Sequence, residues 1–358
     1  MTGPKPEINL RERLAGLLLG TAVGDALGLP AENLSADRIR RLWKGQWKMR
    51  FILGRGMVSD DTEHTLMVAQ ALLIHPEDAS AFQRTLAWKF RWWFVGLPGG
   101  VGLATAKACL KLWIGFPASK CAVNSAGSGP PMRSAVLGAY LADDPVKRRE
   151  FVLASSRLTH RGWQAETAAL AVAECAALAV KSNGMQEPAQ AISVLEKLSF
   201  EPEWQRILNA IKASLEAQHS VSAFACGLGL KSAVSGYSLH VVPVALYAWL
   251  RHPGDFRMAV TSALECGGDT DTVGAILGAL AGVSGGKRCI PAAWLDGLWE
   301  WPRSRHVMEQ IAARLVEQQA SSQSRGPVHY FWPAIILRNS LFLVTVVLHG
   351  FRRLAPPY

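Results

Sequence analysis

The 358-residue sequence has no cysteine pair at the spacing of a zinc site or a redox motif. Its six cysteines are scattered along the chain, so we expect reduced and mostly buried thiols. The N-terminus lacks the apolar core and the small-residue cleavage site of a signal peptide. No long polar tract that would force disorder is present. These absences predict a cytoplasmic protein that is folded over most of its length.

Charged residues make up only 18% of the chain, and basic residues exceed acidic ones to give a net charge of +10. This excess favours acidic or phosphate-bearing partners without specifying either. Six basic residues gather between Arg38 and Arg50, where they alternate with Trp43 and Trp47. We expect a solvated helix with a tryptophan anchor here. The alternative is a contact with an acidic acceptor such as nucleic acid.

The β-branched alternation typical of strands is missing from the longest apolar stretches, which are rich in alanine instead. Ala165–Val180, Val244–Leu250 and Val273–Ala281 carry apolar residues at helical spacing. Glycine recurs at every fourth position from Gly16 to Gly28 and again from Gly274 to Gly282. Such a ridge lets another backbone approach closely, which offsets the cost of about 1 kcal/mol for each glycine in a helix. The sequence therefore predicts an all-α fold.

Two carboxylate-bearing motifs precede apolar helical runs: SDDTE at residues 59–63 and GGDTDT at 267–272. One such motif alone is typical of a helix N-cap, since Ser, Asp and Thr oxygens accept from free amide groups there. Together they offer more oxygen ligands than capping needs. Carboxylate and hydroxyl oxygens suit Mg²⁺ or Mn²⁺ rather than zinc, and four aspartates at one point indicate two ions.

Four segments, in this order and at these separations, resemble the ADP-ribosylglycohydrolase family. They are GLLLGTAVGDALGLPAE (16–32), SDDTEHTLMVAQAL (59–72), SRLTH (156–160) and GGDTDTVGAILGALAG (267–282). The similarity runs from about Leu14 to Gly282. It implies a compact, orthogonal all-α fold with a central two-metal cleft, in which two divalent cations, Mg²⁺ or Mn²⁺, assist cleavage of the bond between ADP-ribose and its acceptor.

The resemblance also assigns roles to individual residues. It places Ser59, Asp60, Asp61, Asp269, Asp271 and Thr272 on the metals. Glu32 falls beside the metals and the scissile bond, so we expect Glu32, Asp60, Asp61 and Asp269 to be the catalytic residues. The substrate-binding residues that it implies are Gly100, Gly102, Ser125, Gly127, Ser128, Gly129 and His160. Ser128 and the prolines at 130 and 131 depart from the family pattern, which leaves the orientation of a ligand in that loop open.

Two further segments are interpreted from their composition. The aromatic run Trp88, Trp92, Trp93 and Phe94 is expected in the core rather than as a platform for adenine. We divide the chain into a catalytic domain at 8–320 and a hydrophobic tail at 321–358. The tail is expected to form a helix docked on the body, with weak membrane-surface contact as the alternative, because Pro333, Arg338 and Asn339 interrupt its apolar stretch.

These observations favour a metal-dependent hydrolase that removes ADP-ribose from a modified protein. A nucleic acid or a small-molecule ADP-ribose adduct is the alternative substrate. The other hypotheses are a protein that binds ADP-ribose without turnover and an immunity-type protein that shields a partner. The sequence specifies neither the acceptor nor the oligomeric state.

Overall fold

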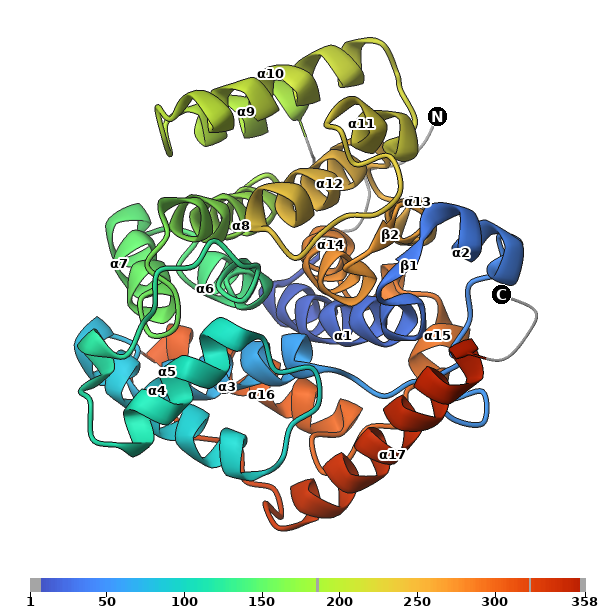
Figure 1. The fold of residues 1–358 in the computed structure, drawn as a ribbon. Helices are drawn as coiled ribbons and strands as arrows, with labels where there is room; N and C mark the ends of the chain where they lie inside the picture. Colours follow the sequence, from blue (N-terminus) through green and yellow to red (C-terminus); the bar gives the residue numbers. More distant parts are fainter. Residues whose placement is uncertain (1–7, 185–186, 322, 355–358) are drawn as a thin grey trace.

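The computed structural model describes residues 8–184, 187–321 and 323–354, and it confirms the predicted all-α fold. Helices of the N-terminal and C-terminal halves surround a central pair, α1 and α14 (Figure 1). The α-helices are α1 (Leu10–Gly28), α2 (Ala36–Trp43), α3 (Asp60–Ile74), α4 (Ala79–Val95), α5 (Leu103–Trp113), α6 (Ala135–Tyr140), α7 (Pro145–Ser156), α8 (Trp163–Lys181), α9 (Pro188–Glu196), α10 (Pro202–Glu216), α11 (Val221–Gly227), α12 (Ser238–Arg251), α13 (Phe256–Leu264), α14 (Thr270–Gly285), α15 (Ala292–Gly297), α16 (Arg305–Ser321) and α17 (Ala334–Leu354). Short 3₁₀ turns are η1 (Leu29–Ala31), η2 (Ala118–Lys120), η3 (Pro131–Arg133) and η4 (Lys287–Cys289), and the strands are β1 (Leu34–Ser35) and β2 (Gly267–Gly268).

The two glycine ridges predicted from the sequence pack against each other. A Cβ atom on Gly20 would lie 2.1 Å from the carbonyl oxygen of Gly278, and one on Gly24 would lie 1.9 Å from that of Gly274. Gly16 faces Gly282 in the same way, so α1 and α14 run antiparallel in backbone contact. This contact brings the C-terminal end of α1 to the N-terminal end of α14.

A two-stranded antiparallel ladder fixes these two ends. Leu34 pairs with Gly268 and Ser35 with Gly267. Gly268 has φ +84°, and a Cβ atom there would lie 1.9 Å from the carbonyl oxygen of Val234. The consecutive glycines of GGDTD therefore let two other backbone segments approach the start of α14.

Two stretches of the described chain are long and apolar enough to cross a membrane by length and composition. Leu10–Ala31 contains the core helix α1 and is buried at every residue from Arg13 onward. Ala334–Arg352 lies within α17, and only 28% of it is buried. The inner side of α17 buries Arg338 and Asn339 against the body of the protein.

The α1–α14 contact predicts a large effect from one added methyl group. Gly278→Ala should lower the free energy of unfolding by about 3 kcal/mol, the upper part of the range for overpacked cores, since its Cβ meets a rigid backbone oxygen. Urea denaturation followed by circular dichroism measures this. Gly350→Ala in α17 is the matched control, because a Cβ there meets no atom within 4 Å. An equal loss in both variants would contradict the packing argument.

Candidate functional site

The N-termini of α3 and α14 open into one cleft with a cavity volume of about 460 Å³. The residues predicted for the site that line it are Glu32, Asp60, Asp61, Gly100, Gly102, Ser125, Gly127, Ser128, Gly129, His160, Asp269, Asp271 and Thr272. The remaining predicted residue, Ser59, is buried directly beneath the cleft as the N-cap of α3. The fold thus gathers residues that are up to 240 positions apart in the sequence.

Hydroxyl groups connect the two helix starts at the floor of the cleft. Ser59 Oγ lies 3.1 Å from Asp61 Oδ2, and Thr272 Oγ1 lies 3.3 Å from the same oxygen. The second oxygen, Asp61 Oδ1, is buried and has no hydrogen-bond partner among the described residues. A buried carboxylate oxygen without a partner is costly in an apolar surrounding, so this atom points to a missing ligand.

Asp25 on α1 positions the start of α3, a role that the sequence analysis missed. Its carboxylate accepts hydrogen bonds from the backbone amide of Ser59 at 2.9 Å and from the amide and hydroxyl of Thr62 at 3.2 and 2.5 Å. Burial raises the pKa of Asp25 to about 7, although these hydrogen bonds act in the opposite direction. A carboxylate from α1 therefore satisfies amide groups of the α3 N-terminus that the helix itself leaves free.

The start of α14 is connected to two loops. Asp269 Oδ2 accepts from Ser128 Oγ at 3.3 Å, and the Asp269 amide donates to the carbonyl of Val234 at 2.8 Å. Glu32 follows η1 on the other side of the cleft and is only partly buried. Because the amide of Asn33 donates to the carbonyl of Gly268, the β1–β2 ladder holds Glu32 close to Asp269.

The carboxylates at the floor of the cleft raise one another's pKa values. Burial is the main cause for Asp60, Asp61 and Asp271, whose pKa values all lie well above the usual range. Repulsion adds to this, chiefly from Asp25 on Asp60, from Asp60 on Asp61 and from Glu32 on Asp271. Ionisation of all of them together requires compensating positive charge.

The donor set fits hard divalent cations in chemical type. Every candidate ligand is a carboxylate or hydroxyl oxygen, and Asp61 Oδ1 is a buried acceptor without a donor. Within the described part of the chain, no three His, Cys, Asp or Glu side chains form a closed ligand group on their own. Hydroxyls of Ser59 and Thr272 lie among the carboxylates and complete the oxygen-rich floor.

The glycine-rich loop at 124–133 packs on His160. A Cβ on Gly129 would lie 2.8 Å from the imidazole, and one on Gly127 would lie 3.1 Å from its Nε2. The amide of Gly127 donates to Ser125 Oγ, and the amide of Ser128 donates to the carbonyl of Gly236. These two amides and those of Met132 and Arg133 are already used within the protein, so an anion in this loop would meet the remaining amides and the Ser125 hydroxyl.

His160 is neutral, because burial and the nearby Arg133 lower its pKa to about 3. Thr159 Oγ1 accepts from Arg133 at 2.8 Å and lies 2.8 Å from His160 Nδ1. The Thr159 hydroxyl can donate to Nδ1, and in that tautomer the imidazole proton lies on Nε2, the atom facing Gly127. His160 thus presents an uncharged imidazole at the wall of the cleft.

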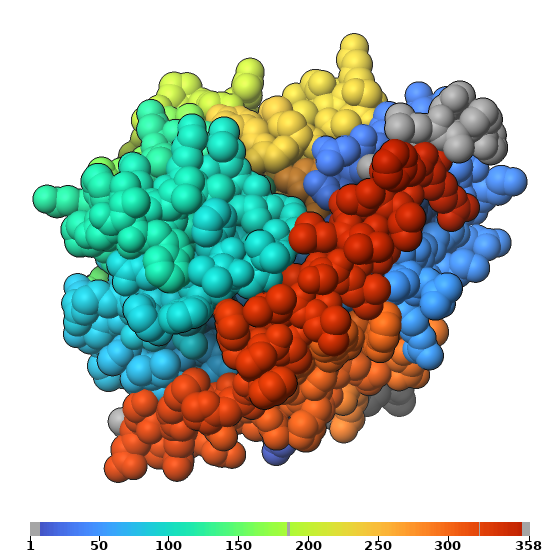
Figure 2. All heavy atoms as spheres, turned by 60° about the horizontal axis from the view of Figure 1, so that its bottom comes forward, coloured from blue at the N-terminus to red at the C-terminus, as the bar shows by residue number. Residues whose placement is uncertain are grey.

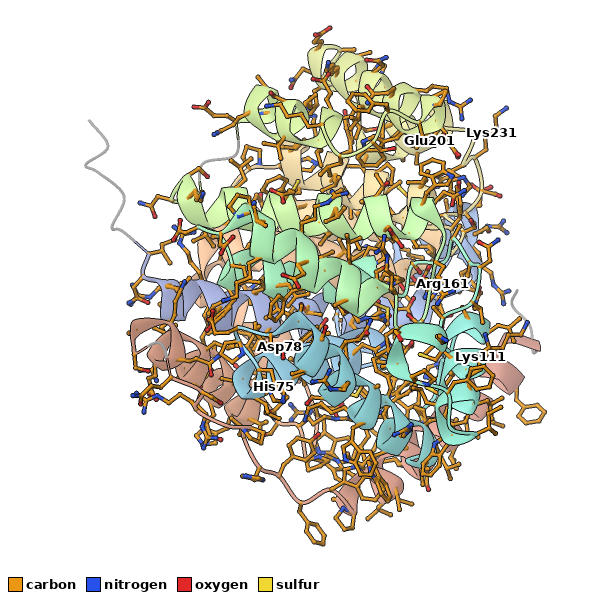
Figure 3. All side chains as sticks on the ribbon, turned by 90° about the vertical axis from the view of Figure 1, so that its left-hand side faces the viewer. His75, Asp78, Lys111, Arg161, Glu201 and Lys231 are labelled. Carbon is orange, nitrogen blue, oxygen red and sulfur yellow. The ribbon has the colours of Figure 1, made fainter. Side chains whose placement is uncertain are left out.

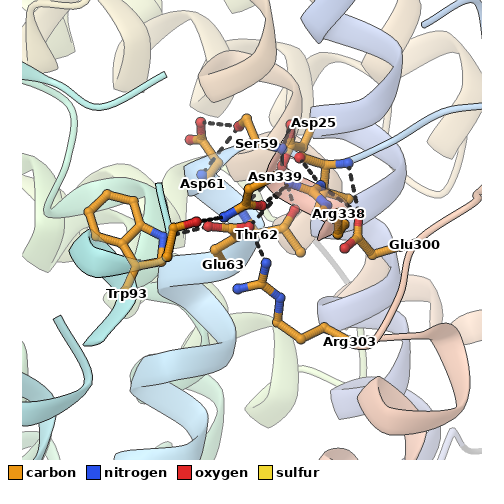
Figure 4. Close-up of polar contacts among 12 residues, drawn as sticks. Asp25, Ser59, Asp61, Thr62, Glu63, Trp93, Glu300, Arg303, Arg338 and Asn339 are labelled. Atoms are coloured by element: carbon orange, nitrogen blue, oxygen red, sulfur yellow. Dashed lines mark hydrogen bonds and ion pairs between the residues drawn. The ribbon is translucent and has the colours of Figure 1, made fainter. Parts of the chain in front are cut away.

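A buried ion network lies on the far side of α3 (Figure 4). Glu63 pairs with Arg303 and with Arg338 of α17, and it accepts from the indole of Trp93. Arg338 also pairs with Glu300 at 2.6 Å. Since Glu63 lies in the first turn of α3 with Asp60 and Asp61, this network fixes the start of the helix on the side opposite the cleft.

The predicted core position of the aromatic run is wrong for two of its members. Trp93 is buried, but Trp88 and Trp92 are 55% and 40% exposed. Both line a second cavity, of about 310 Å³, together with Trp332 of the C-terminal segment. That cavity is mostly apolar and contains none of the four site aspartates, so we assign the chemistry to the acidic cleft.

The basic segment at 38–50 lies outside the cleft. No residue of this segment is among the described residues that line it. Trp43 and Trp47 are buried with ring centroids 5.6 Å apart, and the Arg50 guanidinium lies over the Trp43 ring at 5.1 Å. This is the solvated helix with a tryptophan anchor that the sequence favoured.

The chain is similar to known proteins in both sequence and structure. The family model described as ADP-ribosylglycohydrolase matches residues 6–325. An uncharacterised protein of Archaeoglobus fulgidus is 30% identical over 86% of this chain and 97% of its own. The ADP-ribosyl-[dinitrogen reductase] glycohydrolase of Rhodospirillum rubrum is 25% identical over 88% of this chain and 98% of its own. A solved structure described as an ADP-ribosylglycohydrolase-related protein complex superposes with a TM-score of 0.64 at 26% identity and covers 87% of this chain and 99% of that one.

The role of Asp25 predicts a stability loss that an ordinary helix cap would not give. At about pH 6, below the raised pKa of Asp25, Asp25→Ala leaves two amides and one hydroxyl without an acceptor and should lower the free energy of unfolding by about 3 kcal/mol. The loss should be smaller at about pH 8, because ionisation of the buried carboxyl there already destabilises the folded state. Asp78→Ala is the control, because Asp78 accepts from two amides at the exposed start of α4 and should cost about 1 kcal/mol. Urea titrations compare the two, and a smaller loss for Asp25→Ala would rule out the buried role.

Proposed function

This chain belongs to the ADP-ribosylglycohydrolase family, and from that premise we propose that it hydrolyses the bond between ADP-ribose and a modified protein side chain with the help of two divalent cations. The observation that carries the proposal is the convergence of two acidic helix starts, Ser59–Asp61 and Asp269–Thr272, on one cleft. The Rhodospirillum relative is named for action on a protein, which favours a protein acceptor here.

Ser59, Asp60, Asp61, Asp269, Asp271 and Thr272 would hold the cations, Mg²⁺ or Mn²⁺. When bound, these ions supply charge that compensates the carboxylates, orient the ribose hydroxyls and lower the pKa of a water molecule. The raised pKa values of Asp60, Asp61 and Asp271 mean that cations and protons compete for the same oxygens.

The chain's own groups account for the remaining needs of the reaction. Glu32 lies at the side of the cleft, partly exposed, where it would accept a proton from the water that attacks the anomeric carbon of ribose. The glycine-rich loop would receive the diphosphate with its unused amides and the Ser125 hydroxyl. His160 would donate from Nε2 without adding charge, since its imidazole stays neutral at physiological pH.

Gly100 and Gly102 leave room beside Asp60 for the ribose. Gly100 has φ +80°, and a Cβ there would lie 3.0 Å from Asp60 Oδ1. Gly102 has open space around its Cα, at the N-terminus of α5. A side chain at Gly100 would strain the turn and press on a proposed ligand, so this wall of the cleft has to be bare backbone.

The first test measures release of ADP-ribose from proteins modified at arginine or serine, with added Mg²⁺ or Mn²⁺ and with chelator. Asp269→Asn should lower the rate at least about 100-fold, and Glu32→Gln should lower kcat by about 100- to 10,000-fold with little change in substrate affinity. Asp143→Asn, an exposed carboxylate paired only with Lys181 at 3.9 Å, is the control and should be unaffected.

Other outcomes separate the competing hypotheses. Tight ADP-ribose binding by calorimetry without release from any acceptor would favour a binding or shielding protein. Release that persists in chelator and in Asp269→Asn would exclude the metal-assisted mechanism while leaving hydrolysis intact.

A second test needs no substrate. Mg²⁺ or Mn²⁺ should raise the melting temperature at about pH 8 and much less at about pH 5, because protons then occupy carboxyl groups whose pKa values are raised. The shift should be lost in Asp271→Asn and kept in Asp143→Asn. An equal shift at both pH values would mean that the ions bind elsewhere.

A further inference from the structure

The inner side of helix α17 buries Arg338, Asn339 and Thr345 beside Ile335 and Phe342, whereas its outer side is apolar, unlike that of a helix whose outer side faces water. Arg338 and Asn339 are completely buried, and Asn339 donates to the carbonyl of Gly96 at 2.7 Å. In contrast, Leu337, Leu348 and Phe351 are 69%, 62% and 67% exposed. The helix is therefore anchored to the protein through both polar and apolar residues and presents leucine, valine and phenylalanine outward.

The outer side of α17 continues onto α4, α5 and the loop that follows them. Gly99 lies against Phe342 and Leu343, and Trp92 contacts both Trp113 and Trp332 with ring centroids about 6 Å apart. Figure 2 shows α17 (red) lying across this face beside the segment that contains α4 and α5 (cyan). Ile114, just after α5, is 74% exposed. We call this surface, formed by the exposed apolar side chains of residues 92–116 and 331–351, the apolar face.

The segments that form the apolar face contribute no acidic side chain. No aspartate or glutamate occurs between Asp78 and Asp143, and none follows Glu317. Lys107 of α5 is exposed, Arg352 is exposed just beyond this face at the end of α17, and the partly buried Lys111 donates to the carbonyl of Ala122. Figure 3 shows Asp78, at the start of α4, near the middle of the view and Lys111 toward its right-hand edge.

Apolar side chains together with basic groups favour one kind of binding partner for this face. A second copy of the chain would bring two positively charged surfaces together, whereas an anionic lipid surface offers opposite charge and an apolar interior. We propose that the apolar face docks this protein on membranes that contain anionic lipids. Apart from Leu103 on their shared rim, it lies outside the acidic cleft, and all of α17 lies beyond residue 325, where the family match ends.

The protein lies on the membrane and does not span it. The Ala334–Arg352 stretch has the length and composition of a membrane span, but Arg338 is paired with Glu63 and Glu300 inside the protein. Withdrawing α17 into lipid would break both pairs, since this guanidinium would have to leave two buried carboxylates. An amphipathic helix of this kind rests in the interfacial plane.

Docking would also orient the cleft. Leu103 lines the cleft and is 70% exposed, and Gly99, next to the cleft residue Gly100, lies against α17. The rim of the cleft therefore borders the apolar face. A protein docked in this way would meet substrates held at or near the same lipid surface.

Flotation of the purified full-length chain with lipid vesicles tests the proposal. We expect the protein to float with vesicles of phosphatidylcholine and phosphatidylglycerol, and much less with phosphatidylcholine alone, and to be released by added salt. The double variant Val344→Glu, Leu348→Glu changes two outward side chains one helical turn apart and should lower the partition coefficient by about tenfold or more. The matched control Val146→Glu, Phe200→Glu makes the same kind of change at two exposed apolar residues on other elements and should bind as the unmodified chain does.

Three outcomes would overturn the proposal. One is absence of flotation with anionic vesicles, and another is equal flotation of both double variants. The third is a dimer in sedimentation velocity that only Val344→Glu, Leu348→Glu dissociates, which would make a second copy the occupant.

Thermal unfolding confirms that each variant is folded, and quenching of tryptophan fluorescence by brominated phosphatidylglycerol measures membrane contact of the unmodified chain itself. Flotation involves no turnover, so failure of the proposed hydrolase activity would leave this result unchanged.

Discussion

The backbone contact between α1 and α14 is the constraint on which the rest of the structure depends. Three successive glycines of α1 face three of α14 so closely that a single methyl group would overlap a carbonyl oxygen. Two antiparallel helices at this separation place the end of one beside the start of the other. Asp25 of α1 and Asp271 of α14 therefore lie close enough for the first to raise the pKa of the second. The cleft is in this sense a consequence of helix packing, because its acidic floor is formed where the pair ends.

Burying several carboxylates at one place is unfavourable, and the fold meets this cost with different partners on the two sides of α3. On the inner side, Asp25 takes its hydrogen bonds from backbone amides at the helix start. On the far side, Glu63 is neutralised by Arg303 and Arg338. Asp61 Oδ1, at the floor of the cleft, has no protein partner among the described residues. That division is what a site for external cations requires, because the ligands must be held firmly and yet remain free to bind.

Local patterns in the sequence predict the helical fold and the two acidic helix starts, and the family resemblance predicts the other residues that line the cleft. Fourfold glycine spacing indicates a close helix contact, and hydroxyl and carboxyl groups before an apolar run indicate a helix start. The sequence does not reveal Asp25, since one aspartate inside an apolar helix looks like an interruption until its partners, more than 30 residues away, are known. The role of Arg338 is also not visible in the sequence. A charged residue there argues against a membrane span, but its partner Glu63 lies 275 residues earlier in the chain. Trp88 and Trp92 were misjudged because helical spacing of aromatic residues does not reveal which side of the helix is covered.

The same ion network explains how one chain can combine an acidic cleft with an apolar outer face. Arg338 reaches inward from α17 to Glu63, in the same first turn of α3 as Asp60 and Asp61, so the helix that carries the apolar face is fixed to the helix that carries the site. If leucine or valine stood in place of Arg338 on the inner side of α17, this connection would be lost. Glu63 and Glu300 would then have less positive charge beside them to neutralise them. Placing Arg338 inside therefore stabilises the acidic site, while the exposed residues of α17, most of them apolar, form its outer surface.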